Sequence, residues 1–289
     1  MTRKLFEAFI EKAIFFSGVT AIIVVIMIFI FLIKESFSFF AANDIVTIIS
    51  GTDWYPISHP PKFGFLPLIL GSFLVTIGAI IIAVPIGLAA AIYISEVAPG
   101  WFKEILKTGI ELLAAIPSIV LGFIGIVVLA PFIKNLFNLP SGLTALAGSI
   151  MLAFMAMPTI VSIIEDALNS VPKSYKEGAL ALGATHLQTI RRVILPAASS
   201  GIMAAVMLGI GRVIGETMAV LMITGNAAII PGSILQPVRT LTATIAAEMG
   251  EVIQGSMHYY ALFGIGFVLF VITFFINLGA DMFLHRKKR

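Results

Sequence analysis

The stretch SVPKSYKEGALALGATHLQTIRRVILPAASSGIMAAVMLGIGRVIGE, from Ser170 to Glu216, decides the fold of this chain. Its first half is polar and charged and lies between two long apolar segments. Its second half is apolar but carries an arginine and a glutamate deep inside. This order indicates a structured polar loop between two membrane helices, the second of which carries buried charge.

The composition places the whole chain in a membrane. Of 289 residues, 59% are hydrophobic and only 11% are charged, whereas a soluble globular protein has about a quarter charged residues. The chain has no cysteine, which excludes disulfides, a thiolate nucleophile and a Cys-ligated metal. Its four histidines are scattered without the spacing of metal ligands, so we expect no metal site.

Apolar runs predict an all-α integral membrane protein with six transmembrane helices in a single domain, residues 1–289. The segment 34–62 reads as a polar loop that carries the aromatic sequence FSFF at 37–40. The predicted spans are about 13–33, 66–95, 109–133, 141–164, 197–224 and 259–281.

The distribution of lysine and arginine predicts the orientation of these spans. With the N-terminus in the cytoplasm, 13 of the 18 basic residues face inward, 4 face outward, and Arg212 lies within a span. Cytoplasmic loops carry an excess of Lys and Arg. We therefore expect a multi-pass protein of the cytoplasmic (inner) membrane with both termini inside, and loop 165–196 on the same side. The modest net charge of +3 does not indicate nucleic-acid binding.

The loop 165–196 has the pattern of two short helices joined by a glycine turn. Pro172 can begin the first helix and Gly183 ends it, while Thr185 and Gln188 form a T-x-x-Q capping box for the second. Pro196 is expected to stop the second helix before the next span. The adjacent acids Glu165 and Asp166 are expected to be solvated at the inner end of a helix.

This loop resembles the coupling loop of ABC-transporter permeases, whose motif is E-A-A, three residues, G, nine residues and I-x-L-P. The spacing is intact, with Gly and Val as conservative departures at the second and fifth of the matching positions: Glu177, Gly178, Ala179, Gly183, Val193, Leu195 and Pro196. The resemblance implies that the loop docks into a cleft of a cytosolic ATPase. The alternative is a solvated hairpin without a partner.

Arg212 and Glu216 are the charged pair of the fifth predicted span. Four residues apart in a helix, they are expected on one face, and Arg212 lies 16 residues after Pro196, about 24 Å along a helix. An arginine fork matches the oxygens of phosphate or sulfate, with the glutamate orienting it. A buried structural ion pair is the alternative. Gly211 and Gly215 have the G-x-x-x-G spacing that favours close helix packing.

Three segments resemble phosphate-specific ABC permeases, and the PstC-type more than the PstA-type subunit: FGFLPLILGSFLVT (63–76), LGIGRVIGETMAV (208–220) and PVRTLTATIAAEMGE (237–251). The resemblance implies that Arg212 and Glu216 matter for phosphate passage. It implies as partners a PstA-type permease, a cytosolic ATPase dimer and an extracytoplasmic phosphate-binding protein. This chain has no G-x-x-x-x-G-K-[ST] stretch, so ATP and Mg would be bound by the ATPase and no cofactor by this chain.

The outer loop 225–258 contains an apolar stripe at helical spacing, with threonines and glutamates expected on the opposite face. The stripe either packs on the bundle or touches an external binding protein. Its residues are Val238, Leu241, Ile245, Met249 and Val252.

Three other functions stay open at this point. Permeases for sulfate or molybdate share the architecture that the resemblance implies. An ion-coupled carrier needs no hairpin for an ATPase, and a membrane enzyme needs a cluster of His, Asp or Ser that the sequence does not suggest. We therefore expect a non-catalytic permease subunit.

Overall fold

The structure is a computed structural model that describes the backbone of residues 2–286 and the side chains of residues 7, 9–279 and 282. Lys287, Lys288 and Arg289, which the charge count assigns to the inner side, lie outside the described residues. The elements, in chain order, are α1 (Thr2–Ala42), α2 (Ile45–Ser50), β1 (Trp54–Tyr55), β2 (Lys62–Phe63), α3 (Leu66–Ile92), η1 (Tyr93–Val97), α4 (Gly100–Ala115), α5 (Ser118–Ile124), η2 (Gly125–Leu129), α6 (Ala130–Phe137), α7 (Ala145–Asn169), α8 (Lys173–Ala181), α9 (His186–Thr189), η3 (Ile190–Ile194), α10 (Leu195–Ala197), α11 (Ser199–Ile214), α12 (Met218–Ile223), α13 (Leu241–Glu248) and α14 (Met257–Arg286).

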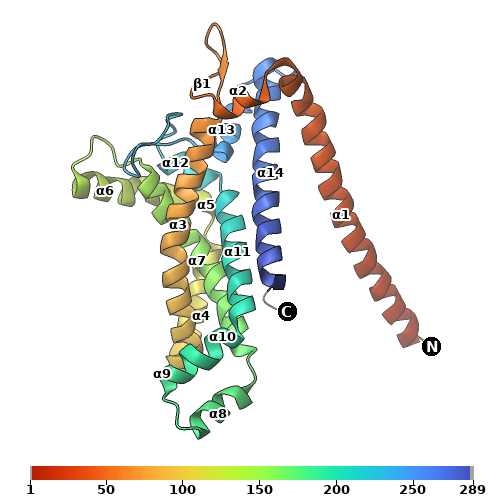
Figure 1. Ribbon diagram of the computed structural model, residues 1–289, viewed down its shortest axis with the longest axis vertical. Helices are drawn as coiled ribbons and strands as arrows, with labels where there is room; N and C mark the ends of the chain where they lie inside the picture. Colours follow the sequence, from red (N-terminus) through yellow and green to blue (C-terminus); the bar gives the residue numbers. More distant parts are fainter. Residues whose placement is uncertain (1, 287–289) are drawn as a thin grey trace.

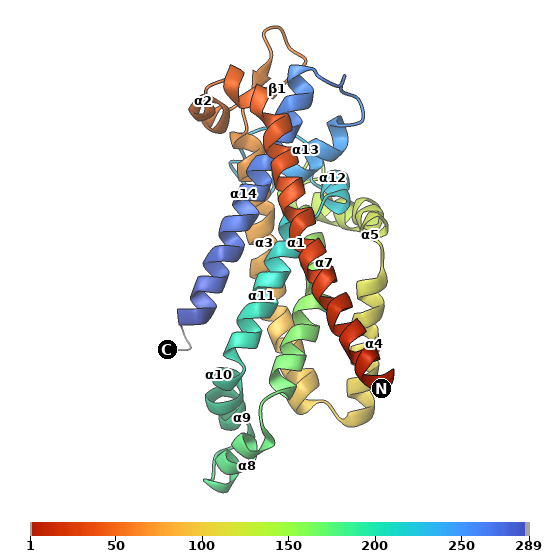
Figure 2. The ribbon, with the colours of Figure 1, turned by 90° about the vertical axis from the view of Figure 1, so that its right-hand side faces the viewer.

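The elements gather at two ends of a helical bundle (Figure 1). We call the end with α8 and α9 the hairpin end, and the end with α2, β1 and α13 the far end. Figure 2 shows that α1 begins toward the hairpin end and runs to the far end. Helix α14 runs the opposite way, from the far end toward the hairpin end. The predicted all-α fold is confirmed, with one small hairpin in which β1 pairs antiparallel with β2.

The core of the bundle is α7, which packs against α3 and α11. Its small residues allow this close packing, and Ala147, Ala153 and Ala156 are fully buried. The hydroxyl of Ser149 donates to the carbonyl of Val75 on α3 at 3.2 Å. In a membrane, where burial against lipid gains little, such small-residue packing and interhelical hydrogen bonds hold helices together.

Within residues 2–286, five helices are long and apolar enough to cross a membrane, and a bent pair makes a sixth candidate span. This matches the predicted number. The first span is much longer than the predicted 13–33, because α1 continues through the FSFF sequence to Ala42. Phe39 is fully buried and stacks on Phe65 at 5.8 Å, so packing at the far end, rather than hydropathy, extends the helix.

The third span differs from the predicted continuous helix at 109–133. Helix α4 ends at Ala115 and α5 begins at Ser118. Ile116, with ψ of 125°, is extended, because a residue that precedes proline is pushed out of the helical region. The candidate span is Ser118–Phe137, and its last part, α6, lies across the direction of α3 (Figure 1).

The fifth span, predicted at 197–224, is divided as well. Pro196 does not stop the second hairpin helix, since it lies inside α10 and a bend of 69° follows, between residues His186–Ala197 and Ser199–Ile214. A second interruption separates α11, which ends at Ile214, from α12, which begins at Met218. The remaining predicted spans correspond to α3, α7 and α14, with ends shifted by several residues.

Candidate functional site

The hairpin of residues 172–196 has the predicted form of helix, glycine turn and helix. Pro172 precedes α8, and Gly183 adopts a φ of +83°, which glycine tolerates and other residues disfavour. The predicted capping box is present in both directions. The amide of Gln188 donates to the Thr185 hydroxyl at 3.3 Å, and the amide of Thr185 donates to the Gln188 side chain at 2.9 Å.

The hairpin exposes apolar side chains at its tip. Leu182 is 90% exposed and Leu187 is 74% exposed, which is unfavourable in water unless a partner covers them. The residues of the coupling motif divide into two groups. Exposed are Glu177, Gly178, Gly183 and Pro196, whereas Ala179, Val193 and Leu195 are partly buried.

Arg212 and Glu216 do not lie on one face of a helix as predicted, and they do not form the ion pair that was the alternative. They do not share a continuous helix, because α11 ends at Ile214 and Glu216 lies in the interruption before α12. Instead, the guanidinium of Arg212 donates to the hydroxyl of Thr159 on α7 at 3.3 Å. A carboxylate oxygen of Glu216 accepts from the amide of Ala219 at 3.3 Å, at the start of α12.

The interruption at residues 215–217 is held by a residue of α13, at the far end of the bundle. The hydroxyl of Thr242 on α13 donates to the carbonyl of Glu216 at 2.8 Å. A carbonyl released from a helix must find another donor in a membrane, and α13 supplies it. The interruption is therefore satisfied by a tertiary contact, which sequence spacing could not reveal.

Arg212 lies on the exposed side of the broken span, where its one hydrogen bond among the described residues is the contact to Thr159. Its side chain is exposed, as are those of Leu208 and Met218, while Ala205, Gly209 and Val213 are buried on the other side. The guanidinium of Arg212 is thus exposed and makes one hydrogen bond to a neutral hydroxyl, so the rest of its donor fork is available to another group.

Comparisons with known proteins identify the family of the chain. Residues 83–289 match the family model described as binding-protein-dependent transport system inner membrane component. The chain belongs to this family. It is therefore a multi-pass membrane protein of an inner-membrane transporter family.

Several curated permeases are similar over most of their length. A probable ABC transporter permease protein of Bacillus subtilis, YqgH, is 43% identical over 265 residues, which cover 91% of this chain and 86% of that protein. The phosphate transport system permease protein PstC of Mesorhizobium japonicum is 38% identical over 259 residues, covering 83% and 78%. The PstC 1 protein of Mycobacterium tuberculosis is 34% identical over 276 residues, covering 83% and 82%.

Solved importer structures share the fold. The bacterial alginate ABC transporter in complex with its pentasaccharide-bound periplasmic protein contains a chain that matches with a TM-score of 0.67 at 14% identity, covering 96% of this chain and 95% of that one. The inward-facing MetNI methionine ABC transporter matches with a TM-score of 0.61 at 20% identity, covering 77% and 97%. Identities this low support the fold alone.

In this permease the close contact between α11 and α7 is made at Gly209, and not at the predicted Gly211 and Gly215. A Cβ atom added to Gly209 would lie 2.7 Å from the side chain of Ile160 on α7, so no larger residue fits there without a shift. A Cβ atom on Gly211 would meet nothing within 4 Å, and one on Gly215 would meet only a backbone oxygen of Gly211. The predicted G-x-x-x-G pair therefore makes no close contact within this chain.

The predicted stripe of the permease's outer loop packs inward, but the residues opposite it are not all exposed. The stripe residues Val238 and Leu241 are buried, and the other three are partly buried against the cluster around Phe39 and Trp54. Three threonines expected on the polar face are also buried: Thr240, Thr242 and Thr244.

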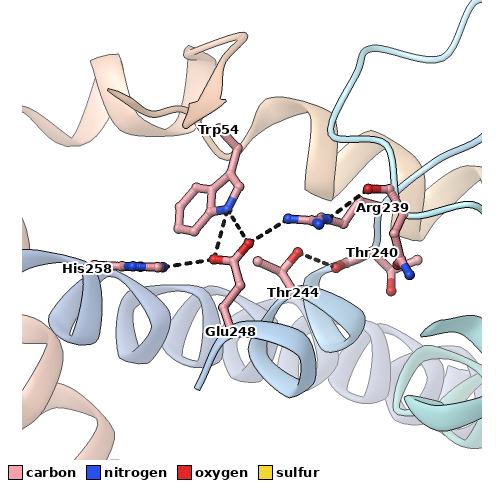
Figure 3. A network of polar contacts seen from close by, with 7 residues as sticks. Trp54, Arg239, Thr240, Thr244, Glu248 and His258 are labelled. Atoms are coloured by element: carbon pink, nitrogen blue, oxygen red, sulfur yellow. Dashed lines mark hydrogen bonds and ion pairs between the residues drawn. The ribbon is translucent and has the colours of Figure 1, made fainter. Parts of the chain in front are cut away.

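At the far end, the carboxylate of Glu248 contacts three other side chains. The sequence predicts this residue on the face of α13 opposite the apolar stripe. Figure 3 shows its carboxylate at the centre of three side chains. The Trp54 indole donates to it at 3.1 Å, Arg239 pairs with it at 2.5 Å and His258 lies at 2.8 Å. Arg239 also donates to the carbonyl of Asn226 at 3.1 Å.

This network joins β1, the loop before α13, α13 itself and the start of α14. It also forms part of the wall of an open pocket of about 920 Å³ that Tyr55 and Glu251 help to line. The four residues lie far apart in the chain, at positions 54, 239, 248 and 258, and have no spacing that connects them. An aromatic loop residue and an isolated glutamate were the signals available, and neither indicated its partner.

Proposed function

We propose that the chain is one of the two transmembrane subunits of an ATP-driven importer that passes inorganic phosphate across the cytoplasmic membrane. The observation that carries this proposal is that the exposed hairpin and the broken span follow each other in one segment. The exposed hairpin with its Gly183 turn leads directly into the broken span that carries Arg212. The names of the PstC relatives support phosphate as the solute.

The hairpin is the part that would receive force from a separate ATPase. The sequence has no phosphate-binding P-loop of its own, so ATP and Mg would be held by an ATPase dimer and the chain would be non-catalytic. Its exposed Leu182 and Leu187 fit a socket on such a partner. The coupling-motif residues, from Glu177 to Pro196, would form the docking surface.

The broken span is the part that would meet the solute. Arg212 presents a planar fork for an oxyanion, and Glu216, which is not paired with it, is free to weaken anion binding so that release follows. A second permease of the PstA type would supply the opposite wall. An extracytoplasmic phosphate-binding protein would deliver phosphate at the far end. The hairpin end and both termini would face the cytoplasm. A reporter that is active only in the cytoplasm, fused after Arg289, would test this orientation.

Uptake in a strain that lacks its own phosphate permeases tests the proposal. The chain is expressed with a PstA-type permease and the ATPase, and radiolabelled phosphate uptake is measured with and without excess sulfate or molybdate. We expect uptake that requires both the chain and the ATPase and that sulfate and molybdate do not inhibit. Inhibition by either anion would favour another oxyanion, and uptake without the ATPase would favour an ion-coupled carrier.

A further inference from the structure

The hairpin is attached to the bundle by an ion pair as well as by its two covalent ends. The ammonium of Lys176 on α8 lies 2.7 Å from a carboxylate oxygen of Glu96. Glu96 belongs to η1, the π-helical continuation of α3, and its side chain is 9% exposed, whereas that of Lys176 is 37% exposed. A charge-assisted contact at this distance to a nearly buried carboxylate is among the stronger polar interactions in proteins.

The position of this pair matters because α3 has no covalent link to the hairpin. The hairpin follows α7 and precedes α11 in the chain, so a displacement of α8 moves those two helices directly. Helix α3 can follow only through side-chain contacts. Within the described residues, Lys176 provides the recorded ion pair between α8 and the inner end of α3.

The residue before Glu96 begins a series of polar contacts that reaches α4 through α7. This residue, Ser95, donates to the side chain of Asn169 at the end of α7, at 3.1 Å, and Asn169 donates to Glu165 at 3.1 Å. Glu165 in turn pairs with Lys103 at 3.2 Å and Lys107 at 3.1 Å, both on α4.

Glu165 thus differs from the solvated acid that the sequence suggested. Its side chain is only 4% exposed, and a buried carboxylate is unfavourable unless its oxygens are paired. Two lysines from α4 and one amide from its own helix satisfy it. This clamp fixes α4 to α7 beside the root of the hairpin, so that α3, α4 and α7 are joined at one end.

We infer that Lys176 and Glu96 are positioning residues that fix the coupling helix α8 to the inner end of α3, so that movement of the hairpin is transmitted to α3 and, through Ser95, Asn169 and Glu165, to α4. The inference rests on the proposed function, because it assumes that an ATPase moves the hairpin. Without the pair, the hairpin would still dock and ATP would still be hydrolysed, but less of the movement would reach the helices that line the path.

Helix α8 contains a matched control for this inference. Lys173 lies three residues before Lys176, is exposed and makes no recorded ion pair. Both lysines contribute one positive charge to α8, and Lys173 lies outside the motif residues that would form the docking surface. Replacing Lys173 by methionine therefore repeats the change in charge without removing the contact to Glu96.

The test measures phosphate transported per ATP hydrolysed by the assembled transporter in proteoliposomes, for wild type, Lys176→Met, Glu96→Gln, the exchange Lys176→Glu with Glu96→Lys, and Lys173→Met. We expect the ratio to fall at least about fivefold in the two single variants, which is the lower range of measured coupling between sites. ATPase activity and complex yield stay near wild type. The exchange recovers the ratio, and Lys173→Met keeps it.

A cross-link distinguishes transmission from simple folding. The chain has no cysteine, so Lys176→Cys with Glu96→Cys accepts a short bis-methanethiosulfonate linker at these two positions only. The linker should restore the ratio and a reducing agent should abolish it. An unchanged ratio in both single variants, or an equal fall in Lys173→Met, overturns the inference. A wild-type complex that hydrolyses ATP without moving phosphate would instead overturn the proposed function.

Discussion

The hairpin and the interruption of the fifth span lie in one continuous segment but are held in different ways. The hairpin is maintained by contacts between near neighbours, such as the reciprocal bonds of Thr185 and Gln188. The interruption is maintained from a distance, since Thr242 is 26 residues from Glu216 and Thr159 is 53 residues from Arg212.

This difference suggests a division of mechanical roles. A locally stabilised hairpin keeps its shape while it is pushed, as a docking element must. A break that depends on α7 and α13 changes when either helix moves, as a gated path must. Changes within the hairpin should therefore affect coupling alone, and changes to the distant contacts should affect the path.

The largest effect is expected from Gly183→Val, which places a β-branched residue in the turn of the hairpin. No neighbouring atom lies within 4 Å of a Cβ atom at this position, so the penalty comes from the positive φ, about 1–3 kcal/mol. The hairpin would change shape to relieve it. We expect ATPase association and uptake to fall about tenfold or more, which corresponds to about 1.4 kcal/mol.

Gly178→Ala is the matched control for this prediction. Gly178 lies inside α8, has no neighbour within 4 Å of an added Cβ atom and has a negative φ. Alanine favours a helix over glycine by about 1 kcal/mol, so uptake should be unchanged. Co-purification of the ATPase with both variants measures the difference. Equal behaviour of the two variants would mean that the turn geometry is not needed for docking.

The same difference explains what the sequence could predict. The turn at Gly183 and the capping box depend on residues within a few positions of one another, so spacing alone identified them. The break after Ile214 depends on a threonine from α13, and the burial of Glu165 depends on lysines from α4. Helical periodicity treats each segment as isolated. It therefore predicts a continuous span, Arg212 and Glu216 on one face of it, and a solvated Glu165.

A smaller effect is expected from Glu248→Gln, which loosens the far end of α13. The change removes the negative charge that Arg239 and His258 face, while the amide can still accept from Trp54. Hydrogen bonds to charged groups contribute about 1.5–3 kcal/mol each. We expect a lower melting temperature of the purified complex and reduced uptake. Glu251→Gln, three residues further on and exposed, should change neither, and a similar loss in both would contradict a specific role for the network.

The smallest effect is expected from Thr242→Val, which removes the hydroxyl that holds the break. The hydroxyl contacts the Thr240 hydroxyl at 3.1 Å as well as the carbonyl of Glu216. Each neutral hydrogen bond contributes about 1 kcal/mol, and the carbonyl of Glu216 would be left without this donor. Uptake should fall severalfold while ATPase association stays at the wild-type level. Thr244→Val is the control, because its hydroxyl bonds only to Thr240 within α13. If Thr244→Val lowered uptake as much, the contact to the break would not be the cause.

The central claim is that the hairpin couples while the broken span passes the solute, and Arg212→Ala tests it most directly. Phosphate uptake, complex yield and ATPase association are measured together for Arg212→Ala, Arg212→Lys, Glu216→Gln and the double variant of Arg212→Ala with Glu216→Gln. We expect Arg212→Ala and Arg212→Lys to lose uptake about tenfold or more with normal yield and ATPase association, and the double variant to stay inactive. Lost yield in Arg212→Ala that the double variant restores together with uptake would contradict the account, because it would make Arg212 and Glu216 a structural ion pair.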